Sequence, residues 1–137
     1  MPETGTPTLP PEHSQTILVL EPDVLVRMVI ADYLRECGYK VVECANADDV
    51  LTLLGSGIGI DIVISGAQSP DGTAGFSLAH RIRVSNPRVQ VILTSSIESA
   101  ASKAVDVCKK GPLTKPYHPH EVVRRIQLLR ERNRTSK

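Results

Sequence analysis

The sequence predicts an α/β fold in which helices cover both sides of a parallel β-sheet. Five short apolar runs alternate with five amphipathic segments along a chain of 137 residues. Strands that are apolar on both faces are typical of a buried parallel sheet, because crossover helices shield both of its surfaces. Five β–α units in a chain of this length favour a doubly wound, flavodoxin-like (βα)5 sandwich with strand order 2-1-3-4-5.

Each expected element follows from its local pattern. Strands are expected at residues 17–20, 39–44, 61–65 and 89–93, with a fifth around Leu113. The first helix is expected to begin after Asp23, whose carboxylate can cap the first turn, and to end at Gly38. Its inward face has helical spacing and comprises Val26, Val29, Ile30, Tyr33, Leu34 and Cys37. The other helices are expected at about residues 46–54, 76–85, 98–109 and 120–132.

The composition indicates one globular domain without a general attraction to nucleic acid. Hydrophobic residues make up 41% of the chain, charged residues 23%, and the net charge is +1. Aromatic residues, at 3%, are too few for base stacking, and no apolar run is long enough to span a membrane. We therefore expect a cytoplasmic protein with a disordered leader at 1–15, a folded domain at 16–132 and a basic tail at 133–137.

The three cysteines are expected to be reduced and mostly buried. Cys37, Cys44 and Cys108 are widely spaced, and no pair has the C-x-x-C spacing of a metal or redox site. Thiols of cytosolic proteins generally stay reduced and behave as small hydrophobic groups. The four histidines are not assigned to a site either, so no metal site is expected.

Several of the expected strands are followed by residues that could form a site. Glu21 and Pro22 follow the first strand, Gly66 the third, Thr94 the fourth and Lys115 the fifth. In the expected strand order these ends meet in one crevice, beside the switch point between the first and third strands. An acid, a hydroxyl and a lysine are parts of a phosphoryl-transfer pocket, but glycine has no side chain that could accept the phosphoryl group.

These motifs resemble the receiver domain of bacterial response regulators. The similarity covers about residues 16–132 and rests on four segments: residues 17–23 followed by Arg27, residues 61–70, Leu93-Thr94-Ser95, and Lys115-Pro116. The resemblance implies a domain that takes a phosphoryl group from a histidine kinase onto an aspartate after the third strand. Two adjacent acids after the first strand would help to hold Mg²⁺, whose charge, with that of a lysine, neutralises the transferring group.

The resemblance implies that the chain keeps only part of this pocket. Glu21 matches the first acid, and Thr94 matches the switch hydroxyl. Lys115 and Pro116 match the lysine and the cis proline that follows it. The carbonyl of Gln68 falls two residues past the acceptor position, where family members supply a metal ligand.

Two positions depart from the family pattern in a way that affects the chemistry. Pro22 replaces the second acid, and Gly66 replaces the acceptor aspartate. We therefore expect no catalytic residue, no enzymatic activity, no cofactor, and Mg²⁺ binding that is lost or very weak. Restoring both acids, with Pro22→Asp and Gly66→Asp, should recover some Mg²⁺ affinity. Pro112 also stands where some family members carry an aromatic switch residue.

The expected function is that of an atypical single-domain response regulator, a pseudo-receiver that acts by protein–protein interaction without aspartyl phosphorylation. Two alternatives remain open. One is a phosphorelay receiver that uses another acceptor, such as Asp71. The other is a sensor in which Lys115 and Thr94 bind an oxyanion or small molecule. Purely structural roles are also open: an ion pair of Lys115 with Glu21, and capping of the next helix by Thr94.

The expected partner is a protein of a two-component pathway, either a histidine kinase or another regulator. A second copy of the chain, in a homodimer, is the other expected partner. The resemblance places the contacts on the face formed by the fourth helix, fifth strand and fifth helix. We represent this face by the exposed charges of Lys110 and Arg124 and by Ala104 and Leu113, whose packing is expected to fix its conformation. Its basic character favours an acidic partner. The arginines at the carboxyl end are interpreted as a solvated helix face: Arg124, Arg125, Arg130, Arg132 and Arg134.

Overall fold

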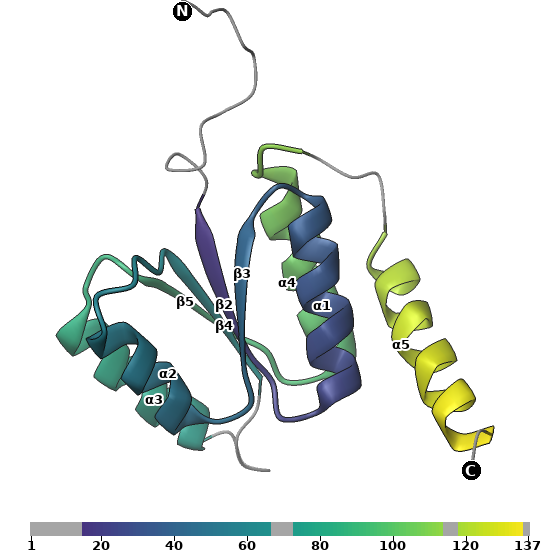
Figure 1. The fold of residues 1–137 in the computed structure, drawn as a ribbon, viewed down its shortest axis with the longest axis horizontal. Helices are drawn as coiled ribbons and strands as arrows, with labels where there is room; N and C mark the ends of the chain where they lie inside the picture. Colours follow the sequence, from purple (N-terminus) through teal and green to yellow (C-terminus); the bar gives the residue numbers. More distant parts are fainter. Residues whose placement is uncertain (1–14, 67–72, 114–117, 136–137) are drawn as a thin grey trace, which may run out of the picture.

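The computed structural model describes residues 15–66, 73–113 and 118–135. Its elements, in chain order, are β2 (Thr16–Leu20), α1 (Val24–Glu36), β3 (Lys40–Cys44), α2 (Ala47–Gly55), β4 (Ile62–Ser65), α3 (Thr73–Ser85), β5 (Gln90–Leu93), α4 (Ile97–Lys109) and α5 (Pro119–Thr135). The sheet has the order β3-β2-β4-β5, and every strand pair is parallel (Figure 1). This order corresponds to 2-1-3-4 of the expected arrangement and confirms the flavodoxin-like α/β fold.

The expected fifth strand is not present among the described residues. Leu113, around which it was expected, lies in a bend after α4, and 59% of its surface is exposed. Pro112 precedes it and has no backbone N–H to donate to a strand ladder. Residues 114–117 lie outside the described part of the chain. The described sheet therefore ends at β5 on this side.

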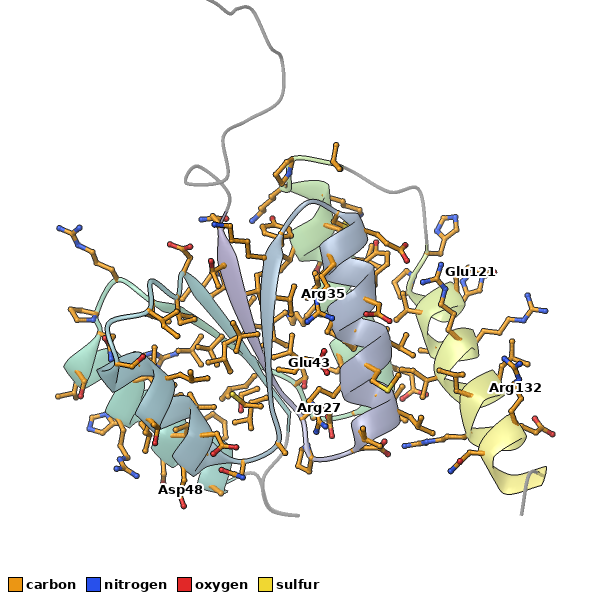
Figure 2. All side chains as sticks on the ribbon, in the orientation of Figure 1. Arg27, Arg35, Glu43, Asp48, Glu121 and Arg132 are labelled. Carbon is orange, nitrogen blue, oxygen red and sulfur yellow. A yellow bond between two sulfur atoms is a disulfide. The ribbon has the colours of Figure 1, made fainter. Side chains whose placement is uncertain are left out.

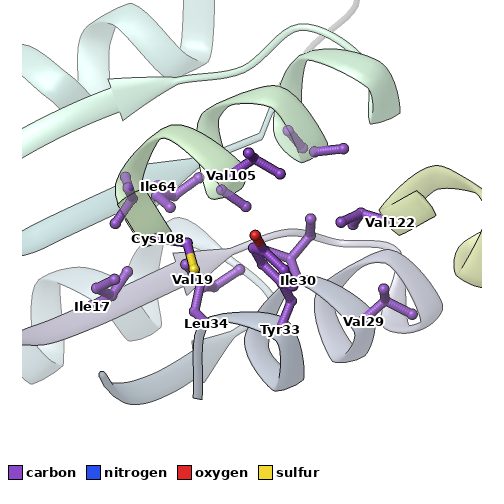
Figure 3. Packing of buried hydrophobic residues seen from close by; sticks show 14 of the residues in the cluster. Ile17, Val19, Val29, Ile30, Tyr33, Leu34, Ile64, Val105, Cys108 and Val122 are labelled. Carbon is purple, nitrogen blue, oxygen red and sulfur yellow. The ribbon is translucent and has the colours of Figure 1, made fainter. Parts of the chain in front are cut away.

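Helices cover both faces of the sheet, as the apolar strands predict. Strand side chains alternate between two hydrophobic clusters: Ile17 and Val19 of β2 join one cluster, and Leu18 and Leu20 join the other. The first cluster, which we call the α1–α4–α5 cluster, also takes in residues of these three helices (Figure 3). The second includes residues of α2 and α3, and Figure 1 shows these two helices on the opposite side of the sheet.

The ends of α1 form as the sequence predicts. The Asp23 carboxylate accepts hydrogen bonds from the amides of Leu25 (2.9 Å) and Val26 (3.3 Å), which caps the first turn. Gly38 follows the helix with φ of +95°, a left-handed conformation that favours glycine. The six predicted inward residues of this helix are all buried.

Two helices are longer than expected. α3 begins at Thr73, three residues before the expected start, and includes Gly75. α5 spans Pro119–Thr135, beyond both expected ends. Glycine and proline next to a helix pattern predict a boundary, but tertiary packing can keep a glycine helical, and proline is well suited to a first helical turn.

The expectation that all cysteines are reduced is wrong for two of them. Cys37 and Cys108 form a disulfide between the ends of α1 and α4, with their Cα atoms 5.5 Å apart. Figure 3 shows Cys108 and its sulfur inside the α1–α4–α5 cluster. The sequence did not indicate this pair because the residues are 71 positions apart and only helix packing brings them together. Cys44 is free and buried, as expected.

No helix within the described ranges is both long enough and apolar enough to cross a membrane.

Candidate functional site

The carboxyl ends of β2, β4 and β5 meet at a shallow pocket of about 210 Å³. The strand register pairs Leu20 with Ser65 and Ser65 with Leu93. The next residue of each strand therefore lies at the same edge of the sheet. The pocket lining includes Glu21, Asp23, Gly66, Thr94, Ser96 and Arg130. The structure thus brings together three of the residues singled out from the sequence: Glu21, Gly66 and Thr94.

The Glu21 carboxylate occupies the space that a side chain at position 66 would take. A Cβ atom built on Gly66 would lie 2.6 Å from Oε1 of Glu21. Gly66 does not have a positive φ, so its backbone conformation does not require glycine. Its amide donates to the Leu20 carbonyl at 2.8 Å, which fixes the backbone at the edge of the sheet. Glycine at 66 therefore makes room for Glu21.

Two hydrogen bonds hold Glu21 in this position, one to its carboxylate and one to its backbone carbonyl. Its Oε2 accepts a hydrogen bond from the Asp23 amide at 2.9 Å, and its carbonyl accepts one from the Arg27 guanidinium at 2.8 Å. Burial raises the pKa of Glu21, the hydrogen bond from the Asp23 amide partly opposes this, and the charge of Asp23 raises it further. The carboxylate at the centre of the pocket is thus a partly desolvated group with a weakened preference for ionisation.

Arg130 of α5 also reaches this pocket, a role that the sequence did not reveal. Its guanidinium donates to the carboxylate of Asp23, and the two side chains form an ion pair. Burial raises the pKa of Asp23, but hydrogen bonds from Arg130 and from the amides of Val26 and Leu25 outweigh it, and the pKa is lowered overall. The expectation that Arg130 lies on a solvated helix face is therefore wrong. Its partner Asp23 is distant in sequence, and only the docking of α5 brings the two together.

Arg27 links the pocket to an ion-pair network on α1 and β3. Its Nε lies 3.5 Å from one carboxylate oxygen of Glu43, and the other oxygen lies 3.1 Å from Arg35. Figure 2 shows these three side chains between the helix and the strand. The network anchors Arg27, which in turn anchors the Glu21 backbone.

Thr94 is buried at the bottom of the pocket and is used structurally. Its hydroxyl donates to the Ser65 carbonyl at 3.4 Å, and its amide donates to the same carbonyl at 2.9 Å. The residue that caps α4 is Ser96, whose hydroxyl accepts from the Ser99 amide at 3.0 Å. The capping role considered for Thr94 is therefore wrong.

Several residues that the sequence assigned to the pocket fall in two segments, 67–72 and 114–117, that the structure does not describe. Lys115, Pro116, Gln68 and the alternative acceptor Asp71 all lie outside the described residues. The cis peptide before Pro116 and the pairing of Lys115 with Glu21 therefore stay predictions. Pro22 is described and exposed. The described residues contain no group of three or more His, Cys, Asp or Glu side chains arranged to hold a metal ion.

The face expected to carry partner contacts agrees only in part with the expectation from the sequence. Lys110 and Arg124 are exposed, in agreement with a contact role. Ala104 is fully buried, so it supports the face from beneath and offers no contact surface. Leu113 is exposed, so it does not pack the interior as expected. Arg125 lies 3.6 Å from Glu36 and is paired.

We expect Glu21→Gln to stabilise the folded protein at neutral pH and to have little effect in acid. The pKa of Glu21 is raised in the folded state. The protonated side chain therefore stabilises the wild-type fold at low pH, and this stabilisation is lost as the pH rises through the folded pKa. Glutamine keeps an acceptor for the Asp23 amide and carries no charge. Melting temperatures of both proteins at about pH 3.5 and pH 7 measure the effect. A lower melting temperature of the variant at pH 7 would contradict it.

A family model described as response regulator receiver domain matches residues 17–127. The match covers most of the chain, and the chain belongs to this family of two-component signalling modules. Transcriptional regulatory protein ResD of Bacillus subtilis (strain 168) is 28% identical over 122 residues. Transcriptional regulatory protein BaeR of Escherichia coli O6:H1 is 27% identical over 122 residues. Each alignment covers 88% of this chain and 50% of the relative, so the chain spans about half the length of these curated relatives.

Solved structures agree with the fold. A response regulator from Thermotoga maritima superposes with a TM-score of 0.56 at 21% identity, covering 83% of this chain and 95% of that one. A structure of the histidine kinase ThkA in complex with the response regulator protein TrrA matches with a TM-score of 0.53 at 28% identity. That match covers 60% of this chain and 69% of the other.

Proposed function

We propose that this chain is a pseudo-receiver, which takes part in two-component signalling through protein contacts and not through aspartyl phosphorylation. The observation that carries the proposal is the arrangement of Gly66 and Glu21 at the end of β4. Gly66 stands in the position that the resemblance assigns to the acceptor, and the Glu21 carboxylate fills the space beside it. A phosphoryl acceptor at this position needs a nucleophilic side chain, and glycine has none.

The same geometry argues against tight Mg²⁺ binding. The Asp23 carboxylate is already paired with Arg130 and caps α1. Glu21 is left as the main anionic ligand, and Mg²⁺ generally needs one or two carboxylates together with phosphate oxygens and water. We therefore propose that the chain uses no metal cofactor and performs no catalysis of its own.

The sensor alternative is less well supported. An oxyanion in the pocket would meet the carboxylate of Glu21, and the guanidinium of Arg130 is engaged with Asp23. Of the two ligands expected for the sensor, Lys115 and Thr94, the second already donates its hydroxyl to the Ser65 carbonyl. These contacts favour a pocket whose polar groups are already engaged with other groups of the chain.

Acetyl phosphate with Mg²⁺ should leave the intact mass of the protein unchanged, because position 66 offers no carboxylate. Mass spectrometry of the treated chain measures this. The Asp71→Ala variant is the control for the alternative acceptor: a stable adduct of one phosphoryl group on the wild type that disappears in this variant would replace the pseudo-receiver by a phosphorelay receiver with an unusual acceptor.

The proposed partner is a histidine kinase or another regulator, or a second copy of the chain. The kinase assignment is supported by the similarity to a chain in the solved complex of the histidine kinase ThkA with the response regulator protein TrrA. The contact surface we propose is the exposed basic part of α4 and α5, defined by Lys103, Lys109, Lys110 and Arg124. Such a surface fits an acidic partner. In a symmetric dimer, Asp106 and Glu121 would supply the bridging acids.

Reversing the charge at Lys110 and Arg124 should weaken association about tenfold or more, because opposite charges across an interface would become like charges. Both side chains are exposed, so the melting temperature should stay nearly unchanged. Analytical ultracentrifugation and kinase-binding titrations measure the effect. The matched control is a reversal at Arg81 and Arg83, which are exposed on α3 on the opposite side of the sheet. If only changes on α1 abolish association, the contact surface lies elsewhere.

A further inference from the structure

The Cys37–Cys108 disulfide joins two elements that are distant in sequence. Cys37 is the C-cap residue of α1, and Cys108 lies in the last turn of α4. Both belong to the α1–α4–α5 cluster, whereas Cys44 belongs to the cluster on the opposite face of the sheet. Cys44 therefore cannot compete for either sulfur in the folded chain. The pairing is decided by which side of the sheet each cysteine faces.

The disulfide lies directly beneath an exposed turn. Both cysteines are fully buried, but Pro112 and Leu113 above them are exposed. Two backbone hydrogen bonds hold this turn to the cysteines: the Gly111 amide donates to the Cys108 carbonyl (3.0 Å), and the Leu113 amide donates to the Cys37 carbonyl (2.9 Å). Opening a short surface turn requires far less free energy than global unfolding. A small thiol or disulfide can therefore reach the sulfurs without unfolding the domain.

The surroundings accommodate the reduced state as well. The Cys108 sulfur lies 3.8 Å from the Leu113 carbonyl oxygen, an acceptor for the S–H group that reduction creates. The Tyr39 hydroxyl donates to the Val107 carbonyl at 2.8 Å, and this link between α4 and the start of β3 does not depend on the disulfide. Reduction therefore removes one covalent link and leaves the packing of the helices in place.

The position of the sulfurs argues against a catalytic dithiol. Both lie at carboxyl ends of helices, where the helix dipole disfavours a negative thiolate. Catalytic cysteines need a stabilised thiolate and usually lie at amino ends of helices. A site of this kind exchanges slowly and keeps its state between exchanges, which suits a regulatory switch better than a turnover enzyme.

We propose that Cys37 and Cys108 form a thiol–disulfide exchange site for low-molecular-weight thiols of the glutathione class, and that its oxidation state fastens or releases the turn at 111–113. In oxidation, one cysteine thiolate attacks glutathione disulfide, forms a mixed disulfide and releases one glutathione. The second cysteine then attacks the mixed disulfide and releases the other glutathione. Two electrons pass to glutathione, and the two thiol protons end on the two released glutathione molecules.

Incubation of the folded chain in glutathione buffers of different thiol-to-disulfide ratio tests the exchange. After acid quenching, unfolding and alkylation, the oxidised chain should carry one alkyl group and the reduced chain three, since the chain has three cysteines. The Cys44→Ser control should carry none and two. Interconversion under native conditions supports the proposal. Reduction only after unfolding, or no disulfide in any buffer, overturns it.

Hydrogen exchange tests the structural consequence in the same buffers. The amides of Gly111 and Leu113 should exchange about tenfold faster or more in the reduced chain, because the turn loses its covalent anchor. The Asn86 amide, which donates to Ile82 at the end of α3, is the internal control and should not change. Cys108→Ser should behave like the reduced wild type. Equal exchange in both states at the turn overturns the proposed switch, whatever the function of the pocket. The inference does not depend on the proposed function.

Discussion

Replacing Cys37 and Cys108 together with alanine should lower the free energy of unfolding by about 4 kcal/mol, the effect of a disulfide that closes a loop of this length. The two residues are 71 positions apart, so the link removes many conformations from the unfolded chain. Natural domains have about 5–15 kcal/mol of stability, so the variant should still fold. Urea unfolding followed by circular dichroism measures the loss, and reductant added to the wild type should reproduce it.

Cys44→Ala is the matched control for this loss, because Cys44 is also buried but forms no disulfide. Its expected effect is about 1 kcal/mol, which is typical of truncating one small buried side chain. If the double variant loses no more than this control, the covalent link contributes nothing to stability.

Changing Pro22 and Gly66 together to aspartate should produce a chain that accepts a phosphoryl group, in contrast to the wild type as we propose it. In the proposed assignment the pair supplies an acceptor and a second acid, so acetyl phosphate with Mg²⁺ should add one phosphoryl group to the intact mass. The Glu21 side chain must first leave the space beside position 66, since its Oε1 lies 2.6 Å from the new Cβ position. Its end is flexible, and Mg²⁺ would favour the rotation by drawing both carboxylates to one ion.

Gly66→Ala separates the steric effect from the charge effect. It also requires Glu21 to move, but it adds no carboxylate, so it should cost about 1 kcal/mol or less and bind no Mg²⁺. Gly66→Asp alone should be less stable than Gly66→Ala when Mg²⁺ is absent, because two carboxylates then share one pocket. If the double aspartate variant binds no Mg²⁺ at millimolar concentration, position 66 is not the acceptor position.

Local patterns were sufficient to predict most of the fold. The Asp23 cap, the Gly38 terminus and the buried face of α1 depend on contacts within a few residues, and the structure has all three. Strand order was inferred from analogy with the flavodoxin-like fold, and the four described strands have that order. The predicted fifth strand is absent from the described residues. Its prediction rested on one apolar residue between prolines, which is weak evidence for a strand.

The sequence by itself determined which chemistry position 66 lacks, because that follows from the residue type alone. Tertiary structure decided three other features: Glu21 fills the vacant space, Arg130 closes the pocket through Asp23, and Cys37 meets Cys108. The first depends on the pairing of β2 with β4, and the other two depend on how helices pack, which brings residues up to 107 positions apart into contact. Such contacts leave no periodic signal in the chain, since hydrophobic packing of whole elements fixes them.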